Sequence, residues 1–183
     1  ASVGRGFATS PASGVTAGSR PCSPAGRRSG TSRTRPAPTV RWISPAGCAR
    51  NWNYLITGQR RALLFDTGPG VRDISKVVGT LTTLPVMALP SHLHFDHTGG
   101  NENFGRAGAL IMAHDNVRKR MSTEQFMAAM NRREPPSPKA ALPVVTFNDG
   151  VTLHFNGDSV MVTHVAPAHT DGDALVHFLK ANV

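Results

Sequence analysis

Residues 91–100 read Ser91-His92-Leu93-His94-Phe95-Asp96-His97-Thr98-Gly99-Gly100. Three imidazoles and one carboxylate fall within six of these residues, and nitrogen and oxygen ligands of this kind suit zinc, iron or manganese. No cysteine lies nearby, which argues against a structural site built from thiolates. The stretch therefore predicts a metal site, and a merely polar surface turn is the alternative interpretation.

An apolar segment at residues 85–90 leads into this stretch and predicts a short buried strand. Ligands that follow the end of a strand lie at the rim of a sheet, where loops collect functional groups. Gly99 and Gly100 come directly after the ligands, and we expect them to let the backbone turn tightly into the next segment. The predicted metal site thus lies on a loop at a sheet edge.

The ligand stretch resembles the signature of the metallo-β-lactamase fold superfamily, whose members include glyoxalase II, lactonases, ribonucleases and true β-lactamases. Two further segments resemble that family. Residues 63–68 read LLFDTG, like the family's strand ending in Asp-Thr-Gly, and residues 167–173 read PAHTDGD, like the segment that carries its next histidine ligand. The resemblance covers roughly residues 51–183. It implies an α/β (α+β) fold: a partial four-layer αββα sandwich, comprising the first half and the start of the second.

By this resemblance, His92, His94 and His169 hold one metal ion, and Asp96 and His97 match ligands of a second. Three neutral imidazoles leave an open position for a water molecule, whose pKa falls to about 7 on zinc. If only one ion binds, Asp96 orients that water or moves its proton. Asp96 is therefore the expected catalytic residue.

The family also supplies a bridging aspartate and a final histidine after the segment of His169, and this chain ends at Val183 before either. We therefore expect a C-terminally truncated family member that binds one zinc ion, where a complete member binds two. Iron and manganese are alternatives to zinc. Asp171 and Asp173 do not match the bridging position, so we expect them to form turns and loop hydrogen bonds.

Asp66 follows a predicted strand and precedes a Thr-Gly-Pro-Gly sequence. It therefore either forms a turn or supports the loop of residues 91–100, called the metal loop from here on. The resemblance favours a carboxylate beneath the metal loop that hydrogen-bonds there and orients the ligands. The remaining histidines lie on or next to predicted strands. We expect these four to be structural residues and not ligands: His114, His154, His164 and His177.

Alternating apolar residues predict strands at residues 54–57, 62–65, 109–113, 144–147, 151–155, 160–165 and 174–179. Turn residues predict that the first pair forms a hairpin, that 144–155 forms another, and that a turn lies at 156–158.

Helical spacing predicts a helix over residues 71–81 and a second helix that Asp115 caps and that runs through Met121. Phe126, Met127 and Met130 are expected on a further helical turn, as ordinary core residues. Residues 131–143 contain four prolines and are expected to form a mobile loop.

The formal net charge of +9 is located in the first third of the chain. Residues 1–65 contain ten arginines and no acidic residue, whereas residues 66–183 contain ten basic and eleven acidic residues. Residues 1–40 are too poor in apolar side chains to offset the entropy of ordering, so we expect a disordered basic tail followed by a metallo-β-lactamase-like domain at 41–183. A targeting sequence and an extraneous segment explain this tail equally well.

Cys22 lies in the low-complexity tail and Cys48 lies just before the first predicted strand, so we expect free thiols, with a disulfide as the alternative. There is no apolar run of 18 residues and no apolar segment typical of a secretory signal. We therefore expect a soluble chain without a membrane span. The cellular compartment and the oligomeric state do not follow from the sequence.

The leading functional hypothesis is a zinc-dependent hydrolase that uses metal-bound hydroxide on an ester, thioester, lactone or β-lactam bond of a small-molecule substrate. One alternative is a truncated domain that binds metal without turnover. Nucleic-acid binding or processing is a weaker alternative. The arginine-rich start favours it, but most of those arginines have no interleaved aromatic residues, and no known nucleic-acid-binding module is present.

Overall fold

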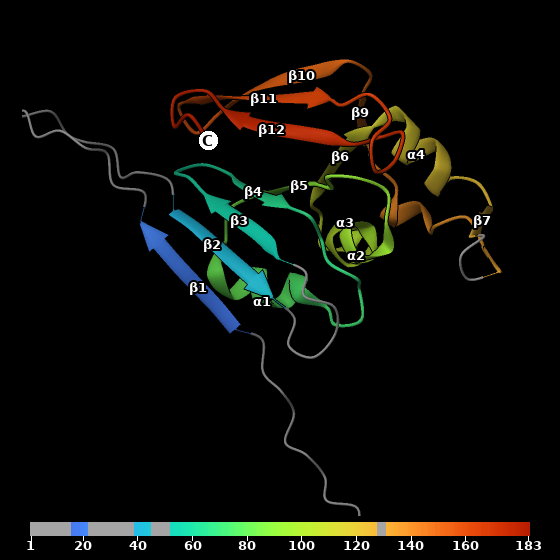
Figure 1. Ribbon diagram of the computed structural model, residues 1–183. Coiled ribbons are helices and arrows are strands. Elements are labelled where there is room, and N and C mark those ends of the chain that lie inside the picture. Colours follow the sequence, from blue (N-terminus) through green and yellow to red (C-terminus); the bar gives the residue numbers. More distant parts are fainter. Residues whose placement is uncertain (1–15, 22–38, 45–51, 128–130) are drawn as a thin grey trace, which may run out of the picture.

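The structure, a computed structural model, describes residues 16–21, 39–44, 52–127 and 131–183. One mixed sheet has the strand order β1-β2-β3-β4-β5-β6-β9, and a smaller sheet has the order β10-β11-β12 (Figure 1). The large sheet contains β1 (Thr16–Pro21), β2 (Thr39–Ser44), β3 (Asn53–Thr57), β4 (Ala62–Phe65), β5 (Val86–Leu89), β6 (Leu110–His114) and β9 (Val145–Phe147). The small sheet contains β10 (Gly150–Phe155), β11 (Asp158–His164) and β12 (Ala174–Phe178).

A separate two-stranded hairpin consists of β7 (Gln125–Met127) and β8 (Arg132–Glu134). The helices are α1 (Ile74–Leu81), α2 (Phe95–Thr98), α3 (Asn101–Arg106), α4 (Asp115–Met121) and the 3-10 helix η2 (Lys139–Ala141). None of the helices in these residues has the length and apolar character that a membrane span needs.

The large sheet changes from antiparallel to parallel at β4. Strands β1 to β4 pair antiparallel, whereas β4, β5, β6 and β9 pair parallel. Parallel neighbours need a crossover connection, and α1 supplies the one between β4 and β5. Because β4, β5 and β6 run in the same direction, their carboxyl ends meet at one edge of the sheet.

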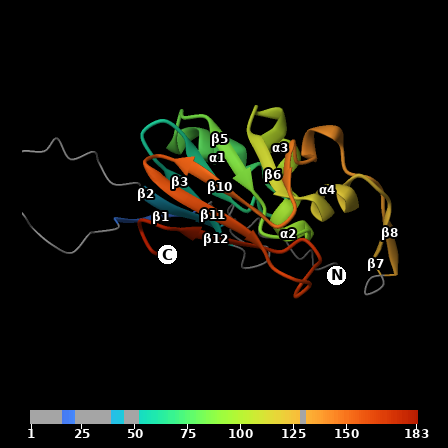
Figure 2. The same ribbon diagram turned by 90° about the horizontal axis from the view of Figure 1, so that it is seen from above.

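The two sheets pack face to face through an apolar core (Figure 2). Leu63 and Leu89 of the large sheet lie in one buried cluster with Phe155, Val160 and Val162 of the small sheet. The alternation of buried and exposed residues along β11 places its apolar side chains on the inner face. The packing of these side chains therefore sets where the loops of the small sheet lie relative to those of the large one.

Helices cover the other face of the large sheet. Ile74 and Val78 of α1 and Phe104 of α3 are buried in a second cluster with Leu55 and Leu64 of the sheet. The described residues thus form three layers, helices on sheet on sheet, which confirms the mixed α/β class and the expected arrangement of the sandwich (Figures 1 and 2).

Several sequence predictions are confirmed at the level of elements. The first expected hairpin is the antiparallel pair β3 and β4. The expected helix over 71–81 is α1, which begins at residue 74 because the side chain of Asp73 accepts a hydrogen bond from the backbone N–H of Ser75 at 3.1 Å. The predicted turn near residue 156 joins β10 to β11, with Asn156 and Gly157 at positive φ of 54° and 86°.

The hairpin predicted over residues 144–155 is wrong. Its first half, β9, pairs parallel with β6 in the large sheet, and its second half, β10, pairs with β11 in the small sheet. The turn residues between them carry the chain from one sheet to the other. An Asn-Asp-Gly turn signal is local and does not specify which strands accept the hydrogen bonds on either side of it.

The helical turn predicted around Phe126 is also wrong. Residues 125–127 form β7, which pairs antiparallel with β8. β8 lies within residues 131–143, which were expected to form a mobile loop. Phe126 is 59% exposed and is not a core residue, so no buried face stabilises a helix here. Met130 and the side chain of Met127 lie outside what the structure describes.

The basic tail differs from the prediction at residues 16–21, which form β1 at the edge of the large sheet. Backbone hydrogen bonds to a sheet edge do not require apolar side chains, which is why composition missed this strand. Thr39 and Val40, also predicted as tail, begin β2, whereas residues 1–15 and 22–38, together with Cys48, lie outside the described residues. The domain boundary at residue 40 stays a prediction.

The cap of α4 is His114 and not Asp115. The Nδ1 atom of His114 accepts a hydrogen bond from the backbone N–H of Asn116 at 3.2 Å, and Asp115 is the first helical residue. His114 still has the extended backbone of β6, with φ −62° and ψ 149°, so the strand runs directly into the helix.

The two glycines at the end of the metal loop serve a different purpose from the one expected. Gly99 and Gly100 have ordinary right-handed backbone angles, with φ of −60° and −82°. A Cβ atom on Gly100 would lie 2.1 Å from the carbonyl oxygen of Thr67, and one on Gly99 would lie 2.5 Å from that of Pro69. These glycines therefore allow two loop backbones to approach each other closely.

We expect Gly100→Ala to lower the free energy of unfolding by about 1–3 kcal/mol, because the added methyl group overpacks against backbone that cannot rotate away. The control is Gly79→Ala in α1, where a Cβ atom would meet nothing within 4 Å. That change should raise stability by about 0.5–1 kcal/mol. Urea denaturation measures both, and equal effects of the same sign would refute the close-approach argument.

Candidate metal centre

Three histidines converge at the edge where the two sheets meet. His92 and His94 lie on the loop after β5, and His169 lies on the loop between β11 and β12. Their ligand atoms all lie within 4.8 Å of one another, and their ring centroids are 4.5–5.0 Å apart. These residues, called the histidine trio from here on, could hold one metal ion. The structure thus brings together residues that lie 77 positions apart in the chain.

The ring of His92 has the properties of a metal ligand. Its Nε2 atom is buried and has no hydrogen-bond partner among the described residues, which is unusual for a buried polar atom. Burial, together with the nearby rings of His97, His94 and His169, lowers its pKa from 6.5 to about 4. A neutral ring keeps its lone pair available for a cation at neutral pH.

The other two members of the trio are more open. His94 and His169 are both exposed, so a ligand can reach the centre from solvent. Burial and the neighbouring His169 lower the pKa of His94 as well. The trio therefore combines two rings of lowered pKa, His92 and His94, with an approach that is open to solvent.

Asp66 holds the metal loop from below. Its carboxylate accepts hydrogen bonds from the backbone N–H of Ser91 at 2.7 Å and from the Nδ1 of His97 at 2.8 Å. Asp66 has a φ of +62°, so it also turns the chain at the end of β4. The structure thus shows both the turn and the hydrogen bonds to the loop, while the orienting of metal ligands by Asp66 stays a prediction.

Asp96 and His97 lie beside the trio and not within it. The Nδ1 of His97 is engaged by Asp66, and its Nε2 lies 3.4 Å from a carboxylate oxygen of Asp96. Burial lowers the pKa of His97, but the hydrogen bond and negative charge of Asp66 outweigh burial and raise that pKa above 6.5. The two groups expected at a second metal position are thus neighbours.

The loop that carries His169 is organised by Asp173. Its carboxylate accepts hydrogen bonds from the backbone N–H of His169 at 2.7 Å and from the backbone and hydroxyl groups of Thr170. Burial raises the pKa of Asp173, but these hydrogen bonds reverse the effect and lower it. The backbone N–H of Ala174 donates to the carbonyl of Ser91 at 2.8 Å, which joins this loop directly to the metal loop.

Helix α4 clamps the same loop from outside. Arg120 donates two hydrogen bonds to the carboxylate of Asp171, at 2.7 and 2.8 Å, and Asn116 donates to the carbonyl of Asp171 at 2.7 Å. The guanidinium group of Arg120 lowers the pKa of Asp171. Sequence reasoning missed this contact, because no local pattern pairs two residues 51 positions apart.

His114 and His164 stack below the loop, with ring centroids 3.9 Å apart and an interplanar angle of 19°. Burial and the neighbouring His164 lower the pKa of His114. The Nδ1 of His164 hydrogen-bonds the carbonyl oxygen of Asp173 at 3.1 Å. His154 and His177, like this pair, lie outside the trio in the part of the chain that is described.

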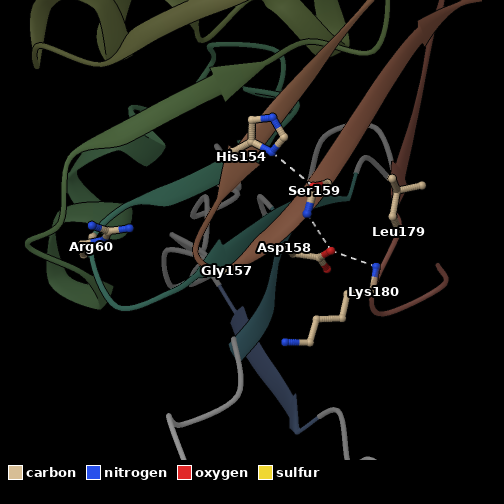
Figure 3. A pocket seen from close by; sticks show the side chains of 7 residues that line it. All are labelled: Arg60, His154, Gly157, Asp158, Ser159, Leu179 and Lys180. Atoms are coloured by element: carbon tan, nitrogen blue, oxygen red, sulfur yellow. Dashed lines mark hydrogen bonds between the residues drawn. The ribbon is translucent and has the colours of Figure 1, made fainter.

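A polar pocket of about 590 Å³ lies at the opposite end of β11 from the histidine trio (Figure 3). Asp158 accepts hydrogen bonds there from the backbone N–H groups of Ser159 and Lys180, both at 2.8 Å. Arg60 and Lys180 also line it. The carboxylate of Asp158 thus links the start of β11 to the segment after β12. We therefore interpret this pocket as structural.

Comparison with known proteins decides the family. The sequence model of the metallo-beta-lactamase superfamily matches residues 46–183. The chain belongs to this superfamily. The resemblance inferred from the ligand stretch is therefore confirmed, and members of this superfamily are mostly hydrolases.

Curated relatives of this superfamily member include acyl-coenzyme A thioesterases called MBLAC2. The protein from Bos taurus is 22% identical over 147 residues, and the one from Gallus gallus is 26% identical over 145 residues. Each match covers 68% of this chain and 52% of the relative. The chain thus spans about half the length of the curated relatives it matches.

Solved structures share the fold of this superfamily member. A metallo-beta-lactamase from Pontibacter korlensis matches with a TM-score of 0.59 and 20% identity, over 81% of this chain and 66% of that one. MEM-A1, a subclass B3 metallo-beta-lactamase from a soil metagenome library, matches with a TM-score of 0.59 and 23% identity, over 76% and 54% of the two chains. At this identity the likeness concerns the fold alone.

We expect the pKa values of His92 and His97 in the metal-free chain to be shifted in opposite directions from 6.5. At pH 5.5, His92 should be neutral, because burial holds its pKa at about 4, whereas His97 should be protonated, because Asp66 raises its pKa above 6.5. Nitrogen-15 NMR of the imidazole rings measures both. A protonated His92 at pH 5.5 would contradict the structure.

The same shifts give the sign of the stability change. The folded pKa of His92 is below its value of 6.5 in the unfolded chain, so His92 destabilises the folded state as pH falls from about 6.5 to about 4. His97 acts in the opposite sense. Its stabilising contribution is complete below pH 6.5 and is lost as pH rises through its raised folded pKa.

Removing the clamp should loosen the loop of His169. We expect Arg120→Ala to speed amide hydrogen exchange at residues 165–174 by about two- to fivefold, since a partly exposed ion pair contributes up to about 1 kcal/mol. The control is Arg106→Ala, which removes an exposed ion pair with Glu102 within α3. Mass spectrometry of peptides measures the exchange, and an equal response of the loop in both variants would exclude a clamp.

Proposed function

We propose that this superfamily member is a metal-dependent hydrolase in which the histidine trio holds one zinc ion. The observation that carries the proposal is the convergence of three imidazoles, delivered by two different sheets, on one point. The buried and unpartnered Nε2 of His92 supports a cation there, because a structural histidine would hydrogen-bond that atom. Three imidazole ligands with an open approach are typical of catalytic zinc, and iron and manganese are the alternatives.

A bound zinc ion supplies Lewis acidity, which polarises a carbonyl group and lowers the pKa of water to about 7. The residues of the chain do the remaining work. Asp96 lines the same groove as His94, and we propose that its carboxylate takes the proton that the attacking water loses. His97 fixes Asp96 from the side, since its Nε2 lies 3.4 Å from the carboxylate.

Asp66 acts through other residues. Its hydrogen bonds hold the ring of His97 and the backbone of Ser91, which precedes the first histidine of the trio. A supporting carboxylate of this kind orients ligands and fixes the tautomer of a histidine. Asp96 and His97 are also the proposed ligands of a second ion, if one binds.

The proposed substrate is a small molecule with an ester, thioester, lactone or β-lactam bond. Relatives named as acyl-coenzyme A thioesterases support a thioester within this set. The likeness to solved β-lactamases concerns the fold and does not favour a β-lactam. Thioesters are therefore the first compounds to assay.

The experiment is metal analysis combined with a chelator-controlled hydrolysis assay. We expect about one zinc ion per chain, hydrolysis that EDTA abolishes, and loss of both zinc and activity by more than about 100-fold in His94→Ala. The matched control is His154→Ala, an exposed histidine on β10 outside the trio. It should change neither quantity.

Two outcomes would contradict this proposal in different ways. Hydrolysis that survives EDTA would exclude a metal-dependent mechanism altogether. Tight zinc binding without turnover of any ester, thioester, lactone or β-lactam would leave a metal-binding domain without catalysis, which is the alternative function.

A further inference from the structure

A groove of about 790 Å³ lies beside the histidine trio and shares His94 with it. His94 and Asp96 line its inner end. One wall comes from α2 and the start of α3, and the other comes from the end of α4 and the β7–β8 hairpin. The hairpin lies at the α4 end of the molecule in both views (Figures 1 and 2). Small-molecule sites have volumes of about 300–1,000 Å³, so the groove is of the size of a ligand site.

The walls of the groove are apolar over much of their length. Leu93 and Phe95 contribute from the stretch around α2, and Met121, Phe126 and Pro138 contribute from the end of α4 and the segments after it. Leu93 packs against the buried cluster that contains Met121. Phe95 and Phe126 are 55% and 59% exposed, although they are large aromatic side chains. Exposed aromatic residues on facing walls of a concave surface are typical of a site that binds apolar groups.

Charged side chains at the groove are already paired within the chain. Arg120 pairs with Asp171, Arg132 pairs with Glu134, and Glu102 pairs with Arg106. Asp96 lies 3.4 Å from His97. A charged ligand would have to compete with these ion pairs, whereas an uncharged apolar chain would not. The charge pattern therefore favours an uncharged aliphatic group as the occupant.

We propose that this groove binds the aliphatic acyl chain of the substrate, with the scissile carbonyl group at the histidine trio and the chain extending towards Phe126. This inference rests on the proposed function and makes it more specific, because it names acyl thioesters and esters of medium to long chain length. The β7–β8 hairpin, where local periodicity predicted a helical turn, then contributes to substrate binding, since Phe126 on β7 forms the outer wall of the groove.

The first test is a chain-length series of thioesters with a constant, uncharged leaving group. The probes are N-acetylcysteamine thioesters of acetate, butanoate, octanoate and dodecanoate, assayed with the zinc-loaded chain. We expect kcat/KM to rise about two- to fourfold per methylene group over the first several carbons, as expected for burial of each group. Phe126→Ala should lower kcat/KM for the dodecanoyl thioester at least about tenfold and lower kcat/KM for the acetyl thioester by a much smaller factor.

Two further variants separate packing from folding. Phe126→Leu keeps an apolar side chain and should retain most of the preference for long chains. Met161→Ala removes an exposed apolar side chain on β11 that does not line the groove, and it should leave the series unchanged. A flat chain-length profile with normal acetyl hydrolysis would overturn this inference and leave the proposed function intact.

The second test does not depend on catalysis. The S-dodecyl thioether of N-acetylcysteamine cannot be hydrolysed, and it is added to the metal-free chain. We expect it to shift the backbone amide NMR signals of Leu93, Phe95 and Phe126, and we expect the S-ethyl thioether to shift none of them. Shifts centred on Met161 instead would overturn the inference. Binding at the groove without any thioester hydrolysis would support the groove while refuting the proposed function.

Discussion

The packing of the small sheet against the large one is the contact on which the histidine trio depends. Two members of the trio come from the loop after β5 and the third from the loop after β11, so no single sheet contains the site. The buried cluster that includes Leu89 and Val160 fixes the distance between these loops. The hydrogen bond from Ala174 to Ser91 then ties the loops together at the site itself. A shift of one sheet over the other would separate the third histidine from the first two.

Around the trio, each loop is held by groups that do not belong to it. Asp66 at the end of β4 supports the first loop, and Arg120 of α4 clamps the second through Asp171. Gly99 and Gly100 bring the first loop so close to the backbone of Thr67 and Pro69, after β4, that no side chain fits between them. The histidine trio therefore lies on two loops that are held in place, is open to solvent at His94 and His169, and adjoins an apolar groove. Such a combination suits a reaction at a polar bond next to an apolar chain.

Local patterns predicted the elements around the site well, because they depend on residues close together in the chain. The strand before the ligands, the helix α1 and the first hairpin all follow from the spacing of apolar residues and from turn or capping residues such as Asp73. The same reasoning failed at Phe126, where an apolar side chain turned out to be exposed on a hairpin. It failed again at β9 and β10, whose turn signal was correct but whose hydrogen-bond partners lie in different sheets.

The sequence by itself determined the family, the strand that leads to the ligands, and the identity of the histidines that could hold a metal. Each of these depends on a short contiguous motif. Only the tertiary structure decided that His169 meets His92, that Arg120 holds Asp171, and that an apolar groove lies beside the site. The physical reason is that periodicity specifies which face of an element is buried but not which partner buries it. Contacts between distant segments depend on how the sheets and helices pack as a whole.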